Sequence, residues 1–181
     1  MHTNKLHKDM EEFLLHLKPK LDAIRSMLTE HDIATDRYLD LGCGDCSLTH
    51  YVAECVKAKQ VYCVDVDYGS LRKASLLGYR TYKLDLNIDK LPFENEYFGI
   101  VTAFDIIEHL MSPDNMLSEA YRSLREGGFF LLSTPNITSW YNRVLMLLGE
   151  PPLGIDLSTK WRYVYPLGVK SVISGHVRLL T

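Results

Sequence analysis

Five short β-rich segments alternate with helical segments between residues 37 and 133, and this alternation limits the possible folds more than any other feature. The predicted strands are residues 37–41, 61–66, 80–84, 98–104 and 129–133. Helical patterns lie between strands at 47–57, 70–77, 105–110 and 114–124, and a loop marked by Leu91-Pro92-Phe93 precedes the fourth strand. Strands separated by helices favour a parallel sheet with helices on both faces. The sequence therefore predicts a doubly wound α/β fold with a mainly parallel sheet.

Helical regions flank this core on both sides. The first thirty residues carry apolar side chains at helical spacing, which Pro19 interrupts. Residues 139–148 are helical again, and a loop rich in proline and glycine follows. We therefore divide the chain into an N-terminal helical cap (1–34), an α/β core (35–136) and a final helix and loop region (137–181).

Composition narrows the class of protein. The chain of 181 residues suits one domain, and 46% hydrophobic with 24% charged residues excludes a disordered chain. A formal net charge of -3 argues against binding nucleic acid or anionic membranes through bulk charge. The sequence has no apolar run near the roughly 20 residues of a membrane span, and its first residues lack a signal-peptide pattern. We expect a cytoplasmic protein without a membrane span or a nucleic-acid partner.

The first predicted strand ends at Asp40 and Leu41, and a loop with two closely spaced glycines follows, Gly42 and Gly44. Two glycines between a strand and a helix let the backbone turn sharply and approach a ligand. The dinucleotide fingerprint G-x-G-x-x-G needs a third glycine where this chain has Ser47, which counts against a nicotinamide or flavin enzyme. Ligands of open α/β sheets bind beyond the carboxyl ends of the strands, so we expect a site at this loop.

Further polar groups stand where the next strands end. Asp65 follows the glycine loop by about 20 residues, the spacing of a carboxylate that binds ribose hydroxyls. Asp67 is the alternative for this role, and either residue can instead cap a turn or a helix. Asp85 and Leu86 follow the third strand, where a carboxylate and a backbone N–H can bind an adenine edge; Phe104 ends the fourth strand. The order of these groups predicts a nucleoside site.

The four cysteines are Cys43, Cys46, Cys55 and Cys63. Cys43 and Cys46 form a C-x-x-C pair, which is typical of a redox pair or of one half of a zinc site. The sequence contains no second pair of this kind, and glycines interleave with the first. We therefore interpret the segment as a ligand-binding turn and assign no metal ligands.

Taken together, these segments resemble the class I S-adenosylmethionine-dependent methyltransferases, especially members with an LDLGCG-type first motif. The similar segments are YLDLGCGDCSL at 38–48, VYCVDVD at 61–67, KLDLNIDKLPFENEYFGIVTAFDIIEHL at 83–110 and LREGGFFLLSTPN at 124–136. The resemblance implies a Rossmann-like fold with strand order 3-2-1-4-5, S-adenosylmethionine as cofactor and S-adenosylhomocysteine as product. The chain departs from the family pattern at Cys46, where a third glycine is usual, and at Gly99, where aspartate is common.

The resemblance also assigns roles to the residues at the strand ends. The assigned cofactor-binding residues are Asp40, Gly42, Gly44, Asp65, Val66, Asp85, Leu86 and Phe104. Those at the first strand and its loop would hold the methionine part of the cofactor. Asp65 would bind the ribose hydroxyls and Val66 would pack on the adenine. The pair after the third strand would bind the adenine edge, and Phe104 would lie along the cofactor.

In such an enzyme the protein mainly aligns the reactants and excludes water. A general base is needed if the acceptor is a hydroxyl or an amine, and His109 and His176 are the candidates. Each of these histidines can equally be structural.

A metal site is a separate possibility. Asp105, Glu108 and His109 would share one helix face, with His176 as a distal ligand. This resembles the E-x-x-E-H metal segment of small-RNA 2′-O-methyltransferases and of ubiquinone-biosynthesis O-methyltransferases. Because the same E-H pair is widespread in metal-free relatives, we expect no metal dependence.

The leading hypothesis is methyl transfer from S-adenosylmethionine to a small-molecule, lipid or sugar acceptor by in-line displacement. The alternatives are a metal-assisted O-methyltransferase acting on RNA or a quinone precursor, and a nucleoside-binding module without turnover. Residues 137–181 predict one helix and a loop, whereas the family's sheet usually continues with two more strands. We therefore expect a C-terminally truncated sheet with the strand 129–133 at its edge. The helix 139–148 or a second copy of the chain would cover this edge, and a homodimer is the favoured cover.

Overall fold

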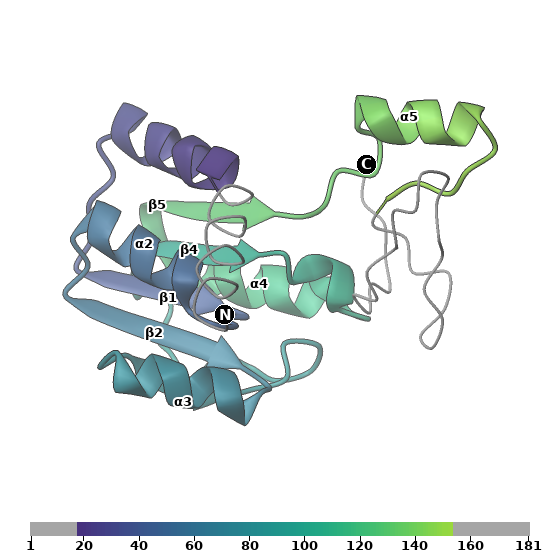
Figure 1. Cartoon of the computed structure of the whole chain (residues 1–181). Helices are drawn as coiled ribbons and strands as arrows, with labels where there is room; N and C mark the ends of the chain where they lie inside the picture. The colour runs from purple at the N-terminus through teal and green to yellow at the C-terminus, as the bar shows by residue number, and fades with distance from the viewer. Residues whose placement is uncertain (1–17, 154–181) are drawn as a thin grey trace, which may run out of the picture.

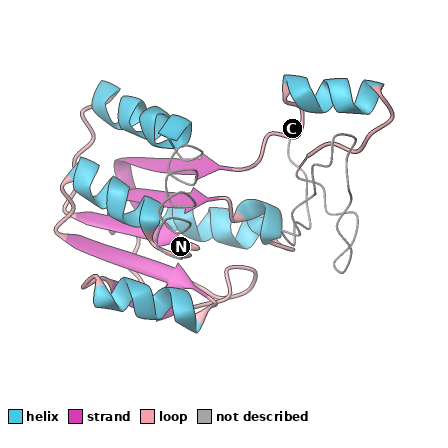
Figure 2. Cartoon of the chain, viewed as in Figure 1, coloured by secondary structure: helices cyan, strands magenta, loops and turns pink. Residues whose placement is uncertain are grey.

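A five-stranded parallel sheet forms the centre of the molecule (Figures 1 and 2). The computed structural model describes residues 18–153. The strands are β1 (Arg37–Leu41), β2 (Gln60–Asp65), β3 (Arg80–Lys83), β4 (Phe98–Phe104) and β5 (Leu124–Ser133). Their order is β3-β2-β1-β4-β5, and all neighbouring pairs are parallel. The predicted Rossmann-like fold and its strand order are confirmed.

Helices cover both faces of this sheet. They are a helix over residues 18–30, α2 (Ser47–Val56), α3 (Tyr68–Leu76) and α4 (Pro113–Ser123), with a 3-10 turn at Ile107–His109. A further helix, α5 (Trp140–Leu147), follows β5 and covers neither face (Figure 1). The predicted helices at 47–57, 70–77 and 139–148 are present, and each begins and ends within two residues of its expected bounds.

None of the helices in residues 18–153 combines the length and apolarity needed to cross a membrane.

Two apolar layers hold the helices to the sheet. On one face, Ile24 of the first helix, Val52 of α2 and Leu71 of α3 belong to one buried cluster. On the other face, Met116 and Ala120 of α4 pack with the opposite side of the central strands. Figure 1 shows α2 and α3 in front of the sheet and α4 behind it. Because β1 and β4 are covered on both faces, all of their residues except Arg37 and Phe104 are buried.

Strand β5 begins earlier than the sequence predicts, at Leu124 instead of residue 129. Its pairing with β4 joins Phe98 to Leu124 and then Ile100 to Phe129, so the register shifts between the two pairs. Gly127, with φ +68°, lies inside this irregularity. Gly127 and Gly128 thus lie in an irregularity inside the strand, and not in a loop before it, because pairing with β4 extends the strand back to Leu124.

The segment 105–110 was expected to be helical and is not an α-helix. Asp105 has φ +52°, a left-handed conformation that an α-helix does not contain. Only the 3-10 turn Ile107–His109 follows it. The chain thus leaves β4 through a sharp turn.

Strand β5 lies at an edge of the described sheet, as predicted. Helix α5 does not lie along this edge; Figure 1 shows it beyond the carboxyl end of β5. Its apolar side chains are exposed, with Trp140 at 76% and Leu147 at 86%. The expectation that residues 137–181 contain no further strand falls partly outside the described residues, which end at 153.

Candidate functional site

The loop after β1 is shaped by its two glycines. Gly42 has φ +79°, and a Cβ atom there would come within 2.8 Å of Ile106 Cγ1. The N–H of Gly42 donates to the carbonyl of Val64 at 2.8 Å, which fixes the loop to β2. Gly44 has φ +51°, but no atom lies within 4 Å of its Cβ position. The loop is therefore closely packed at Gly42 and open at Gly44, where its backbone is accessible to a ligand.

Asp65 ends β2 directly beside this loop. Its Oδ2 accepts a hydrogen bond from the N–H of Gly44 at 2.9 Å, and its Oδ1 accepts one from the N–H of Asp67 at 2.9 Å. The register that pairs Leu41 with Val64 brings the two segments together. A carboxylate has about four acceptor positions, so both oxygens keep capacity for further donors. The carboxylate is thus oriented by the loop and can accept hydrogen bonds from a diol.

The alternative ribose ligand, Asp67, has a different task. It is the N-cap of α3, and its Oδ2 accepts from the N–H of Ser70 at 2.8 Å and from the Ser70 hydroxyl at 3.1 Å. These hydrogen bonds hold the pKa of Asp67 below its ordinary value. The geometry favours Asp65 over Asp67 for the ligand.

Asp40 lies beneath the loop and is only 3% exposed. Its Oδ1 accepts from the Thr102 hydroxyl at 2.6 Å, and its Oδ2 accepts from the Thr49 hydroxyl at 2.5 Å. Tyr38 is hydrogen-bonded to the same Thr102 at 2.8 Å. The sequence analysis did not identify the two threonines, although a threonine in the apolar strand β4 was a visible signal. A direct contact of Asp40 with a cofactor stays a prediction.

Burial raises the pKa of Asp40 from 3.8 to about 6, against the opposing effect of the two threonine hydrogen bonds. The folded state then holds a proton that the unfolded chain has lost, so the free energy of unfolding should fall as the pH rises from about 4 through about 6. The loss should reach about 3 kcal/mol. We expect Asp40→Asn to abolish this decline, as measured by urea denaturation from acid to neutral pH.

Asp36→Asn, at an exposed position, is the matched control and should keep the decline of the wild type. Parallel stability curves for wild type and Asp40→Asn would contradict the assignment of this pH dependence to Asp40.

The third strand leads to a tight polar turn. Asp85 Oδ1 accepts from the N–H of Asn87 at 2.9 Å and from its side-chain amide at 2.7 Å. Leu86 is buried, and its carbonyl accepts from the Asn115 amide at 3.0 Å. Val66, after β2, is 57% exposed and offers an apolar surface. The three predicted adenine contacts therefore follow neighbouring strands at the same edge of the sheet.

The end of β4 is tied to the first helix. Lys20 Nζ lies 2.5 Å from Asp105 Oδ2 and 5.4 Å from the centre of the half-buried Phe104 ring. The hydroxyl of Ser133, at the end of β5, donates to Asp105 Oδ1 at 2.9 Å. Sequence reasoning did not find Lys20, because it is 85 positions from its partner and no local pattern relates the two. The cap thus reaches the strand ends where the site is expected.

The three residues of the alternative metal site do not have the arrangement that this alternative requires. Asp105, Glu108 and His109 do not share a helix face, because Asp105 is left-handed and already engaged by Lys20. Glu108 is 1% exposed in the 3-10 turn, and His109 is half-buried beside it. Within residues 18–153, the one group of potential ligands close enough to share an ion consists of three cysteines. His176 lies outside the described residues.

The residues at this edge fit S-adenosylmethionine part by part. The open backbone at Gly44 admits close approach, Asp65 can accept from a diol, and exposed Val66 offers an apolar surface to a base. Asp40 and Asp65 take part in none of the ion pairs found among the described residues, so their charge suits a cationic sulfonium and ammonium. The groups at the strand ends therefore match the chemical parts of the expected cofactor.

Curated relatives carry the same core. A mitochondrial ubiquinone biosynthesis O-methyltransferase from Candida albicans is 32% identical over 152 residues, which are 77% of this chain and 45% of the relative. A probable S-adenosylmethionine-dependent methyltransferase from Mycolicibacterium smegmatis is 32% identical over 106 residues, 59% of this chain and 40% of the relative. This chain thus spans less than half the length of these two relatives.

A solved S-adenosylmethionine-dependent methyltransferase from Mesorhizobium loti has a similar fold, with a TM-score of 0.53 and 25% sequence identity. The similarity covers 62% of this chain and 52% of that one. The methyltransferase domain family matches residues 39–132, from β1 almost to the end of β5. The chain therefore belongs to the methyltransferase domain family, and this membership implies S-adenosylmethionine as the cofactor of the chain.

Proposed function

We propose that this domain binds S-adenosylmethionine beyond the carboxyl ends of β1, β2 and β4 and transfers its methyl group to a small-molecule, lipid or sugar acceptor. The observation that carries the proposal is the Asp65 carboxylate, which the N–H of Gly44 orients at 2.9 Å beside an open glycine loop. Family membership supports the reaction type. The acceptor class rests on the sequence analysis and on the near-neutral charge of the chain.

When bound, S-adenosylmethionine supplies a methyl group on a sulfonium centre, and the neutral thioether of S-adenosylhomocysteine is a good leaving group. The chain's own residues bind the cofactor and align it with the acceptor. Asp65 holds the ribose hydroxyls, and the backbone at Gly42 and Gly44 accommodates the methionine part. Asp40 adds negative charge beneath the loop, and Val66 covers the base. Fixing both reactants in this way converts an encounter in solution into an oriented one.

Proton removal is needed only for a hydroxyl or amine acceptor. His109, in the 3-10 turn after β4, is the candidate base among the described residues, since histidine is the side chain that most often acts as a general base. His176 remains a candidate on sequence alone.

One relative favours a particular acceptor. The Candida albicans protein, 32% identical, is named for O-methylation in ubiquinone biosynthesis. A phenolic quinone precursor is therefore the second candidate acceptor, and it would suit His109 as the base. The segment Asp105, Glu108 and His109 does not support the metal-assisted form of this reaction, because it forms no shared ligand face.

The test is a methyl-transfer assay with S-adenosylmethionine labelled on its methyl group. The acceptor panel comprises catechols and other phenols, amines, sugars and lipids, and cofactor binding is measured in parallel by calorimetry. We expect binding and transfer of label to one acceptor class. Binding without transfer to any class would favour the nucleoside-binding module, and absence of binding would refute the proposal.

We also propose that two copies associate through the edge of β5. This strand has no neighbour on its outer side among the described residues, and Leu132 on it is half exposed. Exposed strand edges favour pairing with another chain. Sedimentation equilibrium should give a dimer, and Leu132→Lys should shift it toward the monomer. A wild-type chain that stays monomeric at the highest attainable concentration would contradict this.

A further inference from the structure

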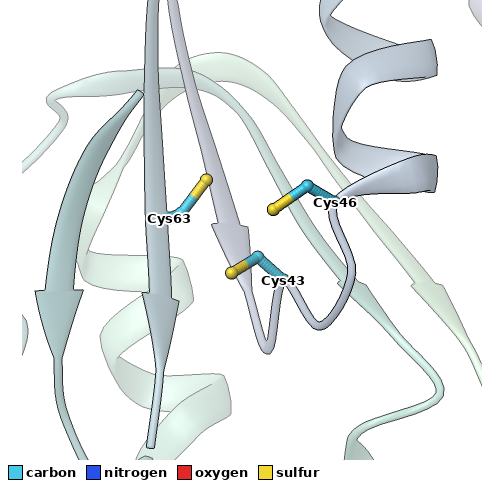
Figure 3. A group of neighbouring side chains, drawn as sticks. All are labelled: Cys43, Cys46 and Cys63. Atoms are coloured by element: carbon cyan, nitrogen blue, oxygen red, sulfur yellow. The ribbon is translucent and has the colours of Figure 1, made fainter. Parts of the chain in front are cut away.

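Three cysteine side chains converge beneath the glycine loop. The sulfur atoms of Cys43, Cys46 and Cys63 all lie within 4.8 Å of one another, and all three residues are buried. Figure 3 shows Cys43 and Cys46 on the loop and Cys63 on the neighbouring strand, with their sulfurs turned toward a common space. All three are free thiols. We refer to these residues as the thiol cluster.

The sheet register explains why the third thiol joins the pair. Cys63 of β2 stands opposite Asp40 of β1, and the loop with Cys43 begins two residues after Asp40. The C-x-x-C pair alone is half of a metal site, and the missing ligand comes from a strand that follows 17 positions after Cys46. Sequence spacing did not reveal this, because the contact depends on strand pairing.

The backbone of Cys46 is strained, and a role for its thiol would explain why a cysteine occupies this position. Cys46 adopts φ +65° at the N-cap of α2, a left-handed conformation that costs a side chain about 1–2 kcal/mol. Its side chain makes no capping hydrogen bond there. The loop therefore holds a strained residue whose sulfur faces two other sulfurs.

The surroundings of the thiol cluster favour a cation. Asp65 Oδ2 lies 3.9 Å from Cys43 Sγ, and the buried Asp40 carboxylate stands opposite Cys63 in the pairing of β1 with β2. A metal ion would supply the positive charge that stabilises thiolates here.

We propose that Cys43, Cys46 and Cys63 bind one thiophilic divalent cation of the Zn²⁺ and Cd²⁺ class. Zn–S bonds of about 2.3 Å place sulfur ligands roughly 3.8 Å apart, so the three sulfurs need to close by about 1 Å at most. One such ion displaces one proton from each of the three thiols. Three protons are released, and the metal–thiolate group carries one negative charge. The fourth position is left for a solvent oxygen, because Asp65 is assigned to the ribose.

The experiment titrates the reduced, metal-free full chain with Co²⁺ and with Cd²⁺ and follows the thiolate-to-metal charge-transfer absorption. We expect a band that saturates at one equivalent and that Zn²⁺ suppresses in the Co²⁺ titration. Cys43→Ser and Cys63→Ser should weaken binding at least tenfold. Cys55→Ser is the matched control, because Cys55 lies on α2 outside the thiol cluster, and it should bind as the wild type does.

A serine at the fully buried position 63 can disturb folding, so Cys63→Ala is compared as well, and far-ultraviolet circular dichroism checks each variant. The wild-type titration does not depend on any variant. Absence of a thiolate band in the wild-type chain would overturn the proposal. Equal loss of binding in Cys55→Ser and Cys63→Ala would overturn it too, as would thiol counting that finds Cys43 and Cys46 already oxidised to a disulfide.

Discussion

Replacing Asp65 with alanine should lower the affinity for S-adenosylhomocysteine by about 10² to 10⁴-fold. The carboxylate is placed to accept two charge-assisted hydrogen bonds from the ribose, each contributing about 1.5–3 kcal/mol. Its present partners, the N–H groups of Gly44 and Asp67, leave acceptor positions on both oxygens. Isothermal titration calorimetry measures the change directly.

Asp67→Ala is the control for this experiment. It removes a carboxylate two residues away and the cap of α3, so it should cost about 1 kcal/mol of stability and leave the affinity nearly unchanged. Asp65→Asn should fall between the wild type and Asp65→Ala, because the amide keeps one acceptor oxygen. If Asp67→Ala lost the affinity and Asp65→Ala kept it, the ribose role would belong to Asp67.

Replacing Gly42 with alanine should destabilise the fold by about 2–5 kcal/mol. The left-handed backbone contributes about 1–2 kcal/mol of this, and overpacking against Ile106 contributes about 1–3 kcal/mol. The new Cβ would lie 2.8 Å from Ile106 Cγ1 and 3.1 Å from Ile106 Cβ, and the second of these atoms cannot move without the backbone. Urea denaturation of the wild type and the variant gives the difference.

Gly44→Ala separates the two contributions. Gly44 is also left-handed, but its Cβ would meet no atom within 4 Å, so only the backbone cost of about 1–2 kcal/mol should appear. Relative to Ile106→Ala alone, the double variant Gly42→Ala/Ile106→Ala should recover the part of the overpacking that comes from Cγ1 and Cδ1, because alanine keeps only Cβ. Equal destabilisation by Gly42→Ala and Gly44→Ala would show that the Ile106 contact contributes nothing.

The architecture was predictable because its signals are local. The strand over residues 98–104 is an almost continuous apolar run, and glycines mark the turn that follows the strand over residues 37–41. The start of β5 was not predictable, because the irregularity at Gly127 arises from pairing with β4. The turn at Asp105 was missed for a similar reason: its left-handed conformation is held by contacts with Lys20 and Ser133, both distant in sequence.

The site was predictable to the level of strand ends and no further. The sequence placed Asp65 and Asp67 at one end but could not separate a ligand from a helix cap, since the distinction depends on the Gly44 and Ser70 hydrogen bonds. The support of Asp40 by Thr102 follows from the β1–β4 register, which pairs these two residues. Contacts set by register are invisible until the strand order is known.

The central claim is that the cofactor binds at the loop of Gly42 and Gly44 with its ribose on Asp65. A crystal structure of the chain grown with saturating S-adenosylhomocysteine tests it most directly. We predict ligand density beyond the carboxyl ends of β1 and β2, with the ribose hydroxyls within hydrogen-bond distance of the Asp65 carboxylate. Density for the ligand at any other place, or a glycine loop free of ligand at saturation, would contradict the claim.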